Sequence, residues 1–307
     1  MHRRLTSHPL ALTRTKVGDD AAGRALVDHW TALTGDLAPA VCVCAGIPSA
    51  TVSAVFSDDG SLVACVADTD AAAAAVTPAW ISRFQPALRS AGAVAVDCNL
   101  TPDALWCVAT AAPRGALWLE PTSEAKSVRA CAVLKHVSVA SPNEAELLAM
   151  AAAVAGDSPA LADDSVILPT PQETALRLAS AARTLLNAGI AFVAVTIGAS
   201  GVLLYDGDSC HHVPAVNVSR VVGVSGAGDA VAAGALTVLS TRLAPWRRED
   251  VLDGLALGVV VASKVVQMPG THIPVQPGSA GASTRAHWRD AAAAVRRGVT
   301  CIQLKHS

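Results

Sequence analysis

Hydrophobic and polar positions follow two successive patterns along the chain. Near the N-terminus, the apolar segments Ala50–Phe56 and Leu62–Ala67 flank an Asp-Asp-Gly sequence at 58–60, which is typical of a β-hairpin. Val41–Cys44 predicts another short strand, and the apolar spacing within Gly18–Thr34 predicts a loop that leads into a helix. From about residue 93 onward, short apolar strands alternate with longer segments of helical spacing.

This alternation predicts an α/β fold with a mostly parallel sheet between two layers of helices. The predicted strands are Ala93–Asp97, Leu117–Glu120, Val137–Ala140 and Phe192–Thr196, with a hairpin formed by Val202–Tyr205 and His211–Val213. The predicted helices are Pro102–Thr110, Ala125–Leu134, Asn143–Val154, Leu176–Ala188, Asp229–Ser240 and Asp250–Val266. Residues 156–174 are rich in Pro and Asp and are expected to form an exposed insertion.

Composition and charge narrow the classes of function. The 307 residues are 52% hydrophobic and 16% charged, and the formal net charge is −2. A disordered chain has the opposite balance, and a near-neutral protein has no general attraction for phosphate backbones, so nucleic acid is not an expected partner. Pro39 and Pro48 interrupt the longest uncharged stretch near the N-terminus, which therefore does not predict a membrane span.

The cysteines and the N-terminal segment indicate in which cellular compartment we expect the protein. Eight cysteines lack both the density of a disulfide scaffold and zinc-ligand spacing, and we expect reduced thiols in a cytoplasmic protein. The basic segment Met1–Lys16 lacks the continuous apolar core of a signal peptide, although it leaves organelle targeting open. His211 and His212 have no neighbours at metal-ligand spacing and are expected to be structural.

The most informative segment is the glycine-rich stretch Val221–Gly234, where small residues mark the change from loop to helix. Gly226 and Gly228 permit a close backbone approach to a ligand, and the free N–H groups of a first helical turn form an anion site. Asp229 beside such a site could accept a proton from a hydroxyl group that attacks a phosphoryl group. Two other interpretations stay open: a dinucleotide-binding turn, and an Asp that only stabilises the helix dipole.

This stretch resembles the signature of the PfkB, or ribokinase-like, family of sugar and nucleoside kinases. The signature reads Asp-Thr-x-Gly-Ala-Gly-Asp, and the chain keeps its last four residues as Gly226, Ala227, Gly228 and Asp229. The resemblance implies a ribokinase-like three-layer α/β/α sandwich with a small β lid. It also implies that Asp229 is the catalytic base and that Gly226, Ala227 and Gly228 form the anion hole.

Two further segments are similar to the family's nucleotide site. Asn143 and Glu146 have the Asn-x-x-Glu spacing that the family uses to organise Mg²⁺, water and the ATP phosphates, so their contact with the metal would be indirect. The same spacing fits a helix capping box, which is the alternative interpretation. Val195–Gly201 looks like the family's Thr-x-Gly-x-x-Gly segment along the nucleotide. The resemblance implies ATP and Mg²⁺ as cofactors, and the other expected nucleotide-site residues are Thr196, Gly198, Gly201 and Ser225.

Three segments look like the pseudouridine kinases within this family. They are Val66–Asp70, Val94–Leu100 and Leu119–Lys126. Each follows a strand, so its polar side chains could face a cleft at the C-terminal edge of the sheet. The resemblance implies that Asp97 and Asn99 meet the substrate, and that Lys126 meets the substrate or a phosphate, supports the loop, or lies in solvent. The expected reaction is ATP-dependent phosphorylation of the 5′-hydroxyl of pseudouridine, with another sugar or nucleoside as the alternative acceptor.

The chain departs from the family pattern in two places. Gly223 and Val224 stand where the family has Asp and Thr, which puts a monovalent-cation site in doubt. Upstream of Val17 the family carries its first core strands and a Gly-Gly motif, which the segment Met1–Lys16 does not match. A truncated, non-catalytic nucleotide-binding remnant is therefore the interpretation that competes with an enzyme.

These observations predict how the chain is organised. We expect an unassigned segment at 1–16, a kinase domain at 17–277 and a C-terminal tail at 278–307. Within the kinase domain, the lid hairpin would occupy about 40–70. The expected partners are a small-molecule nucleoside or sugar and a second copy of the chain, bound as a homodimer through the lid.

Overall fold

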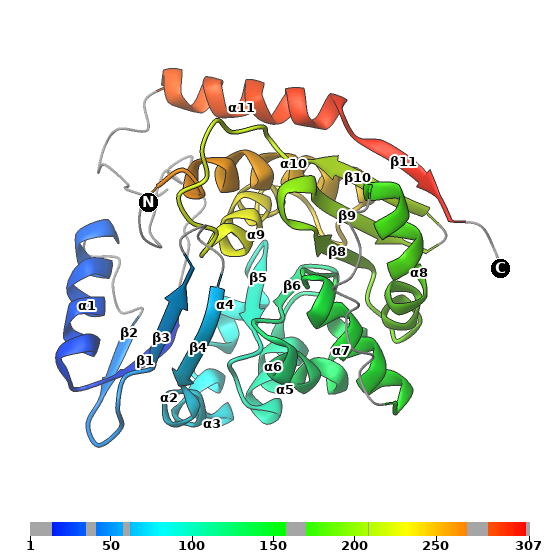
Figure 1. Ribbon diagram of the computed structural model, residues 1–307. Helices are drawn as coiled ribbons and strands as arrows, with labels where there is room; N and C mark the ends of the chain where they lie inside the picture. Colours follow the sequence, from blue (N-terminus) through cyan, green and yellow to red (C-terminus); the bar gives the residue numbers. More distant parts are fainter. Residues whose placement is uncertain are drawn as a thin grey trace, which may run out of the picture.

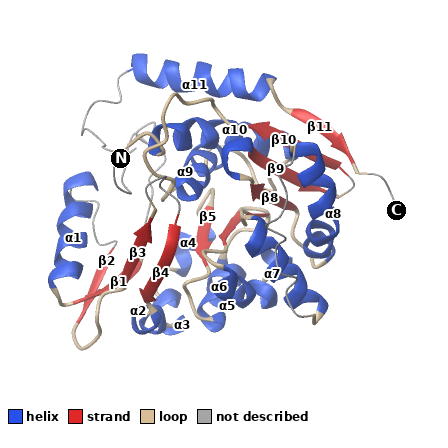
Figure 2. Cartoon of the chain, in the orientation of Figure 1, coloured by secondary structure: helices blue, strands red, loops and turns tan. Residues whose placement is uncertain are grey.

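A seven-stranded sheet with helices on both faces forms the centre of the protein (Figure 1, Figure 2). The structure is a computed structural model that describes residues 14–34, 41–57, 62–157, 170–207, 209–268 and 282–304. The strands are β1 (Thr15–Gly18), β2 (Val41–Cys44), β3 (Thr51–Phe56), β4 (Leu62–Asp68), β5 (Val94–Asp97), β6 (Leu117–Glu120), β7 (Val139–Ala140), β8 (Phe192–Thr196), β9 (Gly201–Asp206), β10 (Ser209–Pro214) and β11 (Thr300–Gln303). The α-helices are α1 (Ala21–Thr34), α2 (Asp70–Ala75), α3 (Pro78–Ser82), α4 (Gln85–Arg89), α5 (Pro102–Ala111), α6 (Glu124–Ser127), α7 (Glu144–Ala155), α8 (Pro171–Asn187), α9 (Ala227–Leu239), α10 (Arg248–Val265) and α11 (Ala282–Arg297). The 3-10 helices are η2 (Val128–Ala132), η3 (Leu134–His136) and η4 (Gly198–Ser200).

The central sheet has the strand order β11-β10-β9-β8-β7-β6-β5. Strands β5 to β8 pair in parallel, whereas β8 to β11 pair antiparallel. Antiparallel neighbours need only a short turn between them, and η4 supplies one between β8 and β9. The predicted three-layer α/β/α fold is confirmed, with its parallel half at β5–β8.

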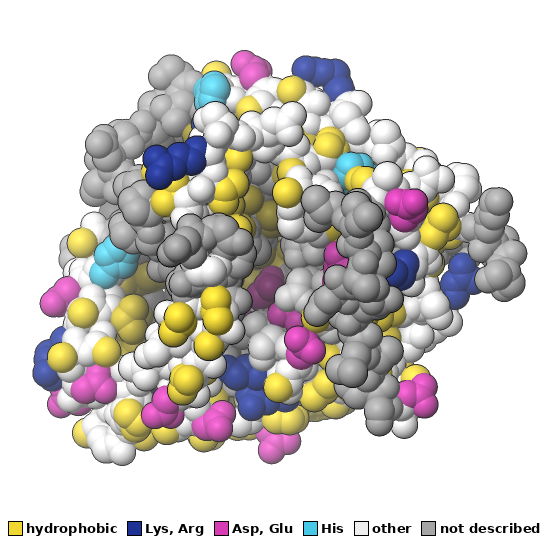
Figure 3. Space-filling model, viewed as in Figure 1, with side chains coloured by type: hydrophobic (Ala, Val, Ile, Leu, Met, Phe, Trp, Pro, Cys, Tyr) yellow, Lys and Arg dark blue, Asp and Glu magenta, His cyan; other side chains and the backbone are white. Residues whose placement is uncertain are grey.

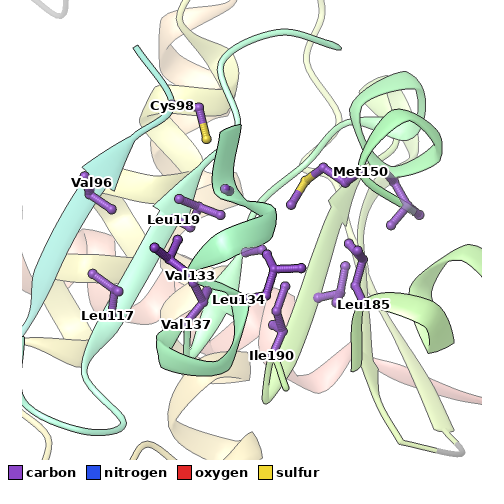
Figure 4. Packing of buried hydrophobic residues seen from close by; sticks show 14 of the residues in the cluster. Val96, Cys98, Leu117, Leu119, Val133, Leu134, Val137, Met150, Leu185 and Ile190 are labelled. Atoms are coloured by element: carbon purple, nitrogen blue, oxygen red, sulfur yellow. The ribbon is translucent and has the colours of Figure 1, made fainter. Parts of the chain in front are cut away.

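Strands β6 to β9 of the central sheet are buried on both faces. Leu117 and Leu119 of β6 pack with α5, α7 and α8, whereas Trp118 between them packs with α9 and α10. This alternation follows from the period of two in a strand, and the burial explains why the segments are nearly continuous apolar runs. Figure 4 shows the first of these two cores, where Met150 and Leu185 approach the sheet from the helices.

Helices α9 and α10 pack against each other at very short range. A Cβ atom on Gly234 would lie 2.6 Å from the Cα of Gly258, and one on Gly258 would lie 2.4 Å from the carbonyl oxygen of Val231. Only glycine permits this approach between the two helix backbones. The contact fixes the position of α9, and therefore of the glycine-rich turn that precedes it.

The N-terminal part forms two smaller sheets. β1 and β2 pair in parallel, and β3 and β4 pair antiparallel as the predicted hairpin requires. The turn predicted at 58–60 lies outside the described residues. The β3–β4 ribbon exposes apolar side chains, among them Val52 at 61% and Val66 at 74% of their full accessible surface. Figure 3 shows this apolar surface over the ribbon.

Several elements differ from the sequence predictions. The predicted helix Ala125–Leu134 is divided into α6, η2 and η3, and the Ser127 hydroxyl donates to the Glu124 carbonyl at the break. Such a local side-chain bond competes with helix continuation. The segment 282–304 forms α11 and β11, and β11 extends the sheet beside β10. The division of the chain into a kinase domain and a tail stays a prediction.

None of the described helices combines the length and apolar character that a membrane crossing needs.

Ion pairs between α10 and α11 hold the C-terminal segment on the sheet. Arg296 of α11 pairs with Glu249 and Asp253 of α10, the latter at 3.1 Å. We expect Arg296→Ala to weaken the docking of α11 and β11 by roughly 0.5–1 kcal/mol, because the pairs are partly exposed to solvent. Hydrogen exchange should show about two- to fivefold less protection of the β11 amides.

The neighbouring Arg297 is exposed and provides the matched control, since Arg297→Ala should leave β11 protection unchanged. Equal protection in the Arg296→Ala variant and the wild type would show that these ion pairs do not hold the segment.

Candidate functional site

A cleft of about 440 Å³ lies where β5, β6, β7 and β8 end and α9 begins. Figure 3 shows acidic side chains inside the hollow at the centre of this face. The lining residues come from five separate parts of the chain and are mostly polar. They are Asp97, Asn99, Glu120, Thr122, Ser141, Asn143, Glu146, Thr196, Gly228 and Asp229.

The cleft brings together most of the residues predicted from the sequence. Those that line it are Asp97, Asn99, Asn143, Glu146, Thr196, Gly228 and Asp229. Gly226 and Ala227 lie in the turn that leads to Asp229, and Lys126 reaches the cleft wall through a hydrogen bond to Asn99. Ser225, Gly198 and Gly201 do not line the cleft. The structure therefore places the predicted residues at one edge of the sheet without assigning a chemical role to any of them.

The start of α9 presents unpaired backbone donors to this cleft. Gly226 is the N-cap with φ +80°, a left-handed conformation that favours glycine. The Ala227 N–H donates to the Val224 carbonyl, whereas the N–H groups of Gly228 and Asp229 have no hydrogen-bond partner in the described part of the chain. Two free donors and the positive end of the helix dipole form an anion site.

Gly228 keeps space open in front of these donors. Outside its own helix, a Cβ atom there would meet no atom of the described residues within 4 Å. The residue lines the cleft, so this open space belongs to the cavity and not to the protein interior. A side chain at this position would occupy the place where a ligand approaches the backbone donors.

Asn143 and Glu146 form the predicted capping box at the start of α7. The Glu146 N–H donates to Asn143 Oδ1 and the Asn143 N–H donates to Glu146 Oε2, both at 2.9 Å. Both side chains also line the cleft, so the cap places them in the site. Glu146 is 6% exposed, and burial raises the pKa of its carboxyl. Thr196 lies next to Asn143, because the two residues form a parallel β-bridge.

The two glycines after β8 shape the turn into β9. Gly198 has φ +57° and Gly201 has φ +105°, both left-handed. A Cβ on Gly201 would lie 2.2 Å from the Val213 carbonyl oxygen of β10. His212 hydrogen-bonds through Nε2 to the Ser200 carbonyl at 2.7 Å, which supports the same turn. This geometry accounts for both glycines without a ligand.

Three residues of the cleft were not among the predicted site residues: Glu120, Thr122 and Ser141. Glu120 follows Trp118 on the side of β6 that faces α9, and its carboxylate accepts a hydrogen bond from the Ser141 hydroxyl at 2.5 Å. Thr122 has φ +73°, which is uncommon for a threonine and places strain beside the site. The available signal was the polar residue that ends an otherwise apolar strand, at the same edge as Asp97.

A comparison with models of protein families identifies the family of this chain. The family model described as pfkB family carbohydrate kinase matches residues 14–277, which is most of the chain. The chain belongs to the pfkB family. The predicted family resemblance is therefore confirmed.

Individual members of the pfkB family match shorter stretches. A pseudouridine kinase of Arabidopsis thaliana is 37% identical over 158 residues, which cover 50% of this chain and 41% of that relative. A 1-phosphofructokinase of Haloferax volcanii is 37% identical over 102 residues, covering 33% of this chain and 31% of the relative. The matches therefore span less than half the length of both relatives.

Solved structures extend the likeness to the whole fold. The ribokinase of Arabidopsis thaliana in complex with ribose and ATP superposes with a TM-score of 0.62 at 19% identity, covering 92% of this chain and 81% of that one. At this identity the match shows the ribokinase-like fold alone.

Negative charge accumulates in the cleft of this pfkB family member. Burial raises the pKa of the Glu120 carboxyl to about 7. The hydrogen bond from Ser141 opposes that shift, whereas the negative charges of Asp229 and Glu146 add to it. Burial is therefore the main reason that this carboxyl group resists ionisation, and the neighbouring negative charges are the smaller one.

This raised pKa predicts how stability changes with pH. The ordinary pKa of a glutamate carboxyl is 4.5, so between about pH 4.5 and 7 the native protein holds a proton that the unfolded chain loses. The free energy of unfolding should therefore fall across that interval. Glu120→Gln removes the titrating group, and its stability relative to the wild type should rise by about 1–3 kcal/mol from pH 4.5 to pH 8.

Urea unfolding at the two pH values, with EDTA and without nucleotide, measures this difference. Glu124→Gln changes an exposed glutamate of α6 and is the control for replacing a glutamate by glutamine. A Glu120→Gln advantage that is the same at both pH values would contradict the raised pKa.

Proposed function

We propose that this chain transfers the γ-phosphate of ATP to the 5′-hydroxyl of a nucleoside, with pseudouridine as the acceptor. The observation that carries the proposal is the start of α9, where Asp229 and Gly228 both line the cleft and the Gly228 N–H group has no hydrogen-bond partner among the described residues. Asp229 removes the proton of the attacking hydroxyl, and the N–H groups of Gly228 and Asp229 stabilise negative charge on the transferred phosphoryl group. The anion hole comprises the turn from Gly226 through Ala227 to Gly228.

Two features of the cleft suit the phosphates of a nucleotide. The free N–H groups suit an anion, and the absence of a side chain on Gly228 leaves room for it. Asn143, Glu146 and Thr196 form the adjacent wall and would hold the nucleotide side of the reaction. Ser225, Gly198 and Gly201 do not line the cleft, and we propose that they contribute to the nucleotide site only by shaping the turns beside it.

Magnesium also fits the residues present. Four carboxylates line the cleft, those of Asp97, Glu120, Glu146 and Asp229, and Mg²⁺ prefers oxygen ligands. Among the described residues no three His, Cys, Asp or Glu side chains gather closely enough to hold a metal by themselves. Mg²⁺ would therefore bind largely through water and phosphate, near Asn143 and Glu146, and would offset the negative charge of both cleft and nucleotide.

The choice of a nucleoside rests on the relatives and on the opposite wall of the cleft. The relative from Arabidopsis thaliana is a pseudouridine kinase, and Asp97 and Asn99 place a carboxylate and an amide next to each other. A sugar is the second candidate, because the relative from Haloferax volcanii is a 1-phosphofructokinase and the Arabidopsis thaliana ribokinase structure contains ribose.

Two further features accompany the proposal. The exposed valines of the β3–β4 ribbon support a homodimer through this lid, since a second copy would cover apolar surface that is now in solvent.

All eight cysteines are free thiols, which fits the reducing conditions of the cytoplasm.

Asp229→Asn tests the proposed base. The amide cannot accept the proton, so phosphate transfer to pseudouridine should fall to less than about one-hundredth of the wild-type rate while ATP affinity changes little. Asp103→Asn is the matched control, because Asp103 also lies in a first helical turn, that of α5, but does not line the cleft. Turnover above about one-hundredth of wild type in Asp229→Asn would exclude Asp229 as the base.

The same assay, run with pseudouridine, uridine, ribose and fructose, separates the candidate functions. Transfer to pseudouridine supports the proposal, and transfer only to a sugar supports the second candidate. ATP binding without transfer to any of the four would identify a nucleotide-binding protein instead of a kinase.

Gly228→Val tests the phosphate position. The valine side chain would enter the cleft in front of the helix N-terminus, so affinity for a non-hydrolysable ATP analogue should fall at least about tenfold. Stability should change little, because among the described residues no atom outside this helix lies within 4 Å of the new Cβ. Gly223→Val is the control, since its surroundings are equally open and it does not line the cleft. Unchanged affinity in Gly228→Val would place the phosphates elsewhere.

A further inference from the structure

Two basic side chains reach from the segment after β6 to the loop that follows β5. Lys126 Nζ donates hydrogen bonds to Asn99 Oδ1 at 2.7 Å and to Thr69 Oγ1 at 2.9 Å. Arg129 Nη1 donates to the backbone carbonyls of Cys98 and Asn99, at 3.3 and 3.0 Å. Both the side chain and the backbone of Asn99 are therefore held in place by donors from this segment.

The contact with Lys126 determines which way the amide of Asn99 is turned. An ammonium group has three donors and no acceptor, so it must meet the carbonyl oxygen of the amide and not its NH₂ group. The NH₂ group then points away from Lys126. Within the described residues Asn99 Nδ2 has no hydrogen-bond partner, and Asn99 is a half-buried residue of the cleft wall.

Asp97 stands beside this amide in a fixed relation to it. The Asn99 N–H donates to Asp97 Oδ1 at 2.9 Å, which holds the two residues in a local turn. The wall therefore offers two amide donors next to a carboxylate acceptor. This pair complements a ligand edge that carries an acceptor oxygen beside an O–H or N–H donor, as on a ribose ring or a nucleobase.

We propose that Lys126 is a positioning residue for the acceptor substrate. It holds the carbonyl of Asn99 and thereby directs the amide donors of Asn99 toward the acceptor. Lys126 acts through Asn99 and does not itself touch the substrate. The inference rests on the proposed function, because it requires an acceptor molecule bound beside Asp97 and Asn99.

Lys126 also connects the cleft wall formed by Asp97 and Asn99 to the residue that follows the β3–β4 ribbon. Thr69 directly follows β4, the second strand of the ribbon, and Arg129 adds an ion pair to Asp70 at 3.8 Å. Asp70 is 90% exposed, so this second link is weak. The bond from Lys126 to Thr69 is therefore the stronger connection between the ribbon and the wall that binds the acceptor.

Lys126→Met in the full chain is the first test. Without the ammonium group the amide of Asn99 is free to turn, so the acceptor KM should rise about tenfold. The kcat should change by less than about threefold, and the KM for ATP should stay within about twofold, because the nucleotide side of the cleft is untouched. An unchanged acceptor KM, or an equal rise in both KM values, would overturn the proposal.

A double-mutant cycle tests whether Lys126 acts through Asn99. Asn99→Ala removes the amide, and Lys126→Met should then add less than about twofold to its effect on acceptor KM. If the two substitutions acted independently, the acceptor KM of the double variant would rise about a hundredfold, and this result would overturn the proposal. Lys135→Met is the control for loss of a lysine, because Lys135 is exposed on η3 and its ammonium group lies over the ring of Trp106, away from Asn99.

Asn99→Asp separates substrate recognition from stability. A carboxylate can still accept from Lys126 but offers no N–H donor, so the acceptor KM should rise about tenfold while Tm stays at or above the wild-type value. An acceptor KM equal to that of the wild type would show that the donors of Asn99 are not used.

A readout without turnover distinguishes failure of this inference from failure of the proposed function. If the wild type phosphorylates none of the tested acceptors, the proposed function fails, and the NMR signals of the Asn99 side-chain NH₂ group still report on its orientation. Lys126→Met should shift these signals and speed their exchange with solvent, whereas Lys135→Met should not. Identical Asn99 signals in Lys126→Met and the wild type would overturn the positioning role.

Discussion

Burial of strands β6 to β9 on both faces of the central sheet is the constraint on which the site depends. Along β6 and β8 successive side chains enter opposite apolar cores, so a polar group inside either strand would lose its hydration without compensation. Polar side chains therefore occur where the strands end. Because β5 to β8 run in parallel, their C-terminal ends meet at one edge, and Asp97, Glu120 and Thr196 come together there. The cleft follows from the fold.

The N-terminus of α9 offsets the negative charge of the carboxylates at this edge of the sheet. Four carboxylates line one cleft, and burial, with a smaller contribution from the negative charges of Asp229 and Glu146, raises the pKa of Glu120. The N-terminus of α9 brings free N–H groups and the positive end of a helix dipole to the same place. The close backbone contact between Gly234 and Gly258 holds that terminus in position. An anionic ligand and a cation would thus each find complementary charge within one small space.

The sequence predicts some of these features better than others. The run from Gly226 to Asp229 stands out because small residues at a loop-to-helix boundary are typical of a backbone that approaches an anion closely. Glu120 lies in a segment that the resemblance brings to this edge, but a single polar residue at the end of an apolar strand does not mark it as a site residue, and its bond to Ser141 arises only when β6 pairs with β7. The contact between Lys126 and Thr69 joins residues 57 positions apart, so no local pattern reveals it. α11 and β11 were missed because their stability depends on ion pairs with α10 and pairing with β10.

The central claim is that this cleft transfers phosphate between two bound small molecules. Phosphorus NMR of the wild-type chain mixed with ATP, Mg²⁺ and pseudouridine tests it most directly, because donor, product and hydrolysis signals are resolved in one spectrum. The account predicts loss of the γ-phosphate signal of ATP together with the appearance of ADP and a nucleoside 5′-monophosphate in equal amounts. An unchanged ATP spectrum, or ADP accompanied only by inorganic phosphate, would contradict it.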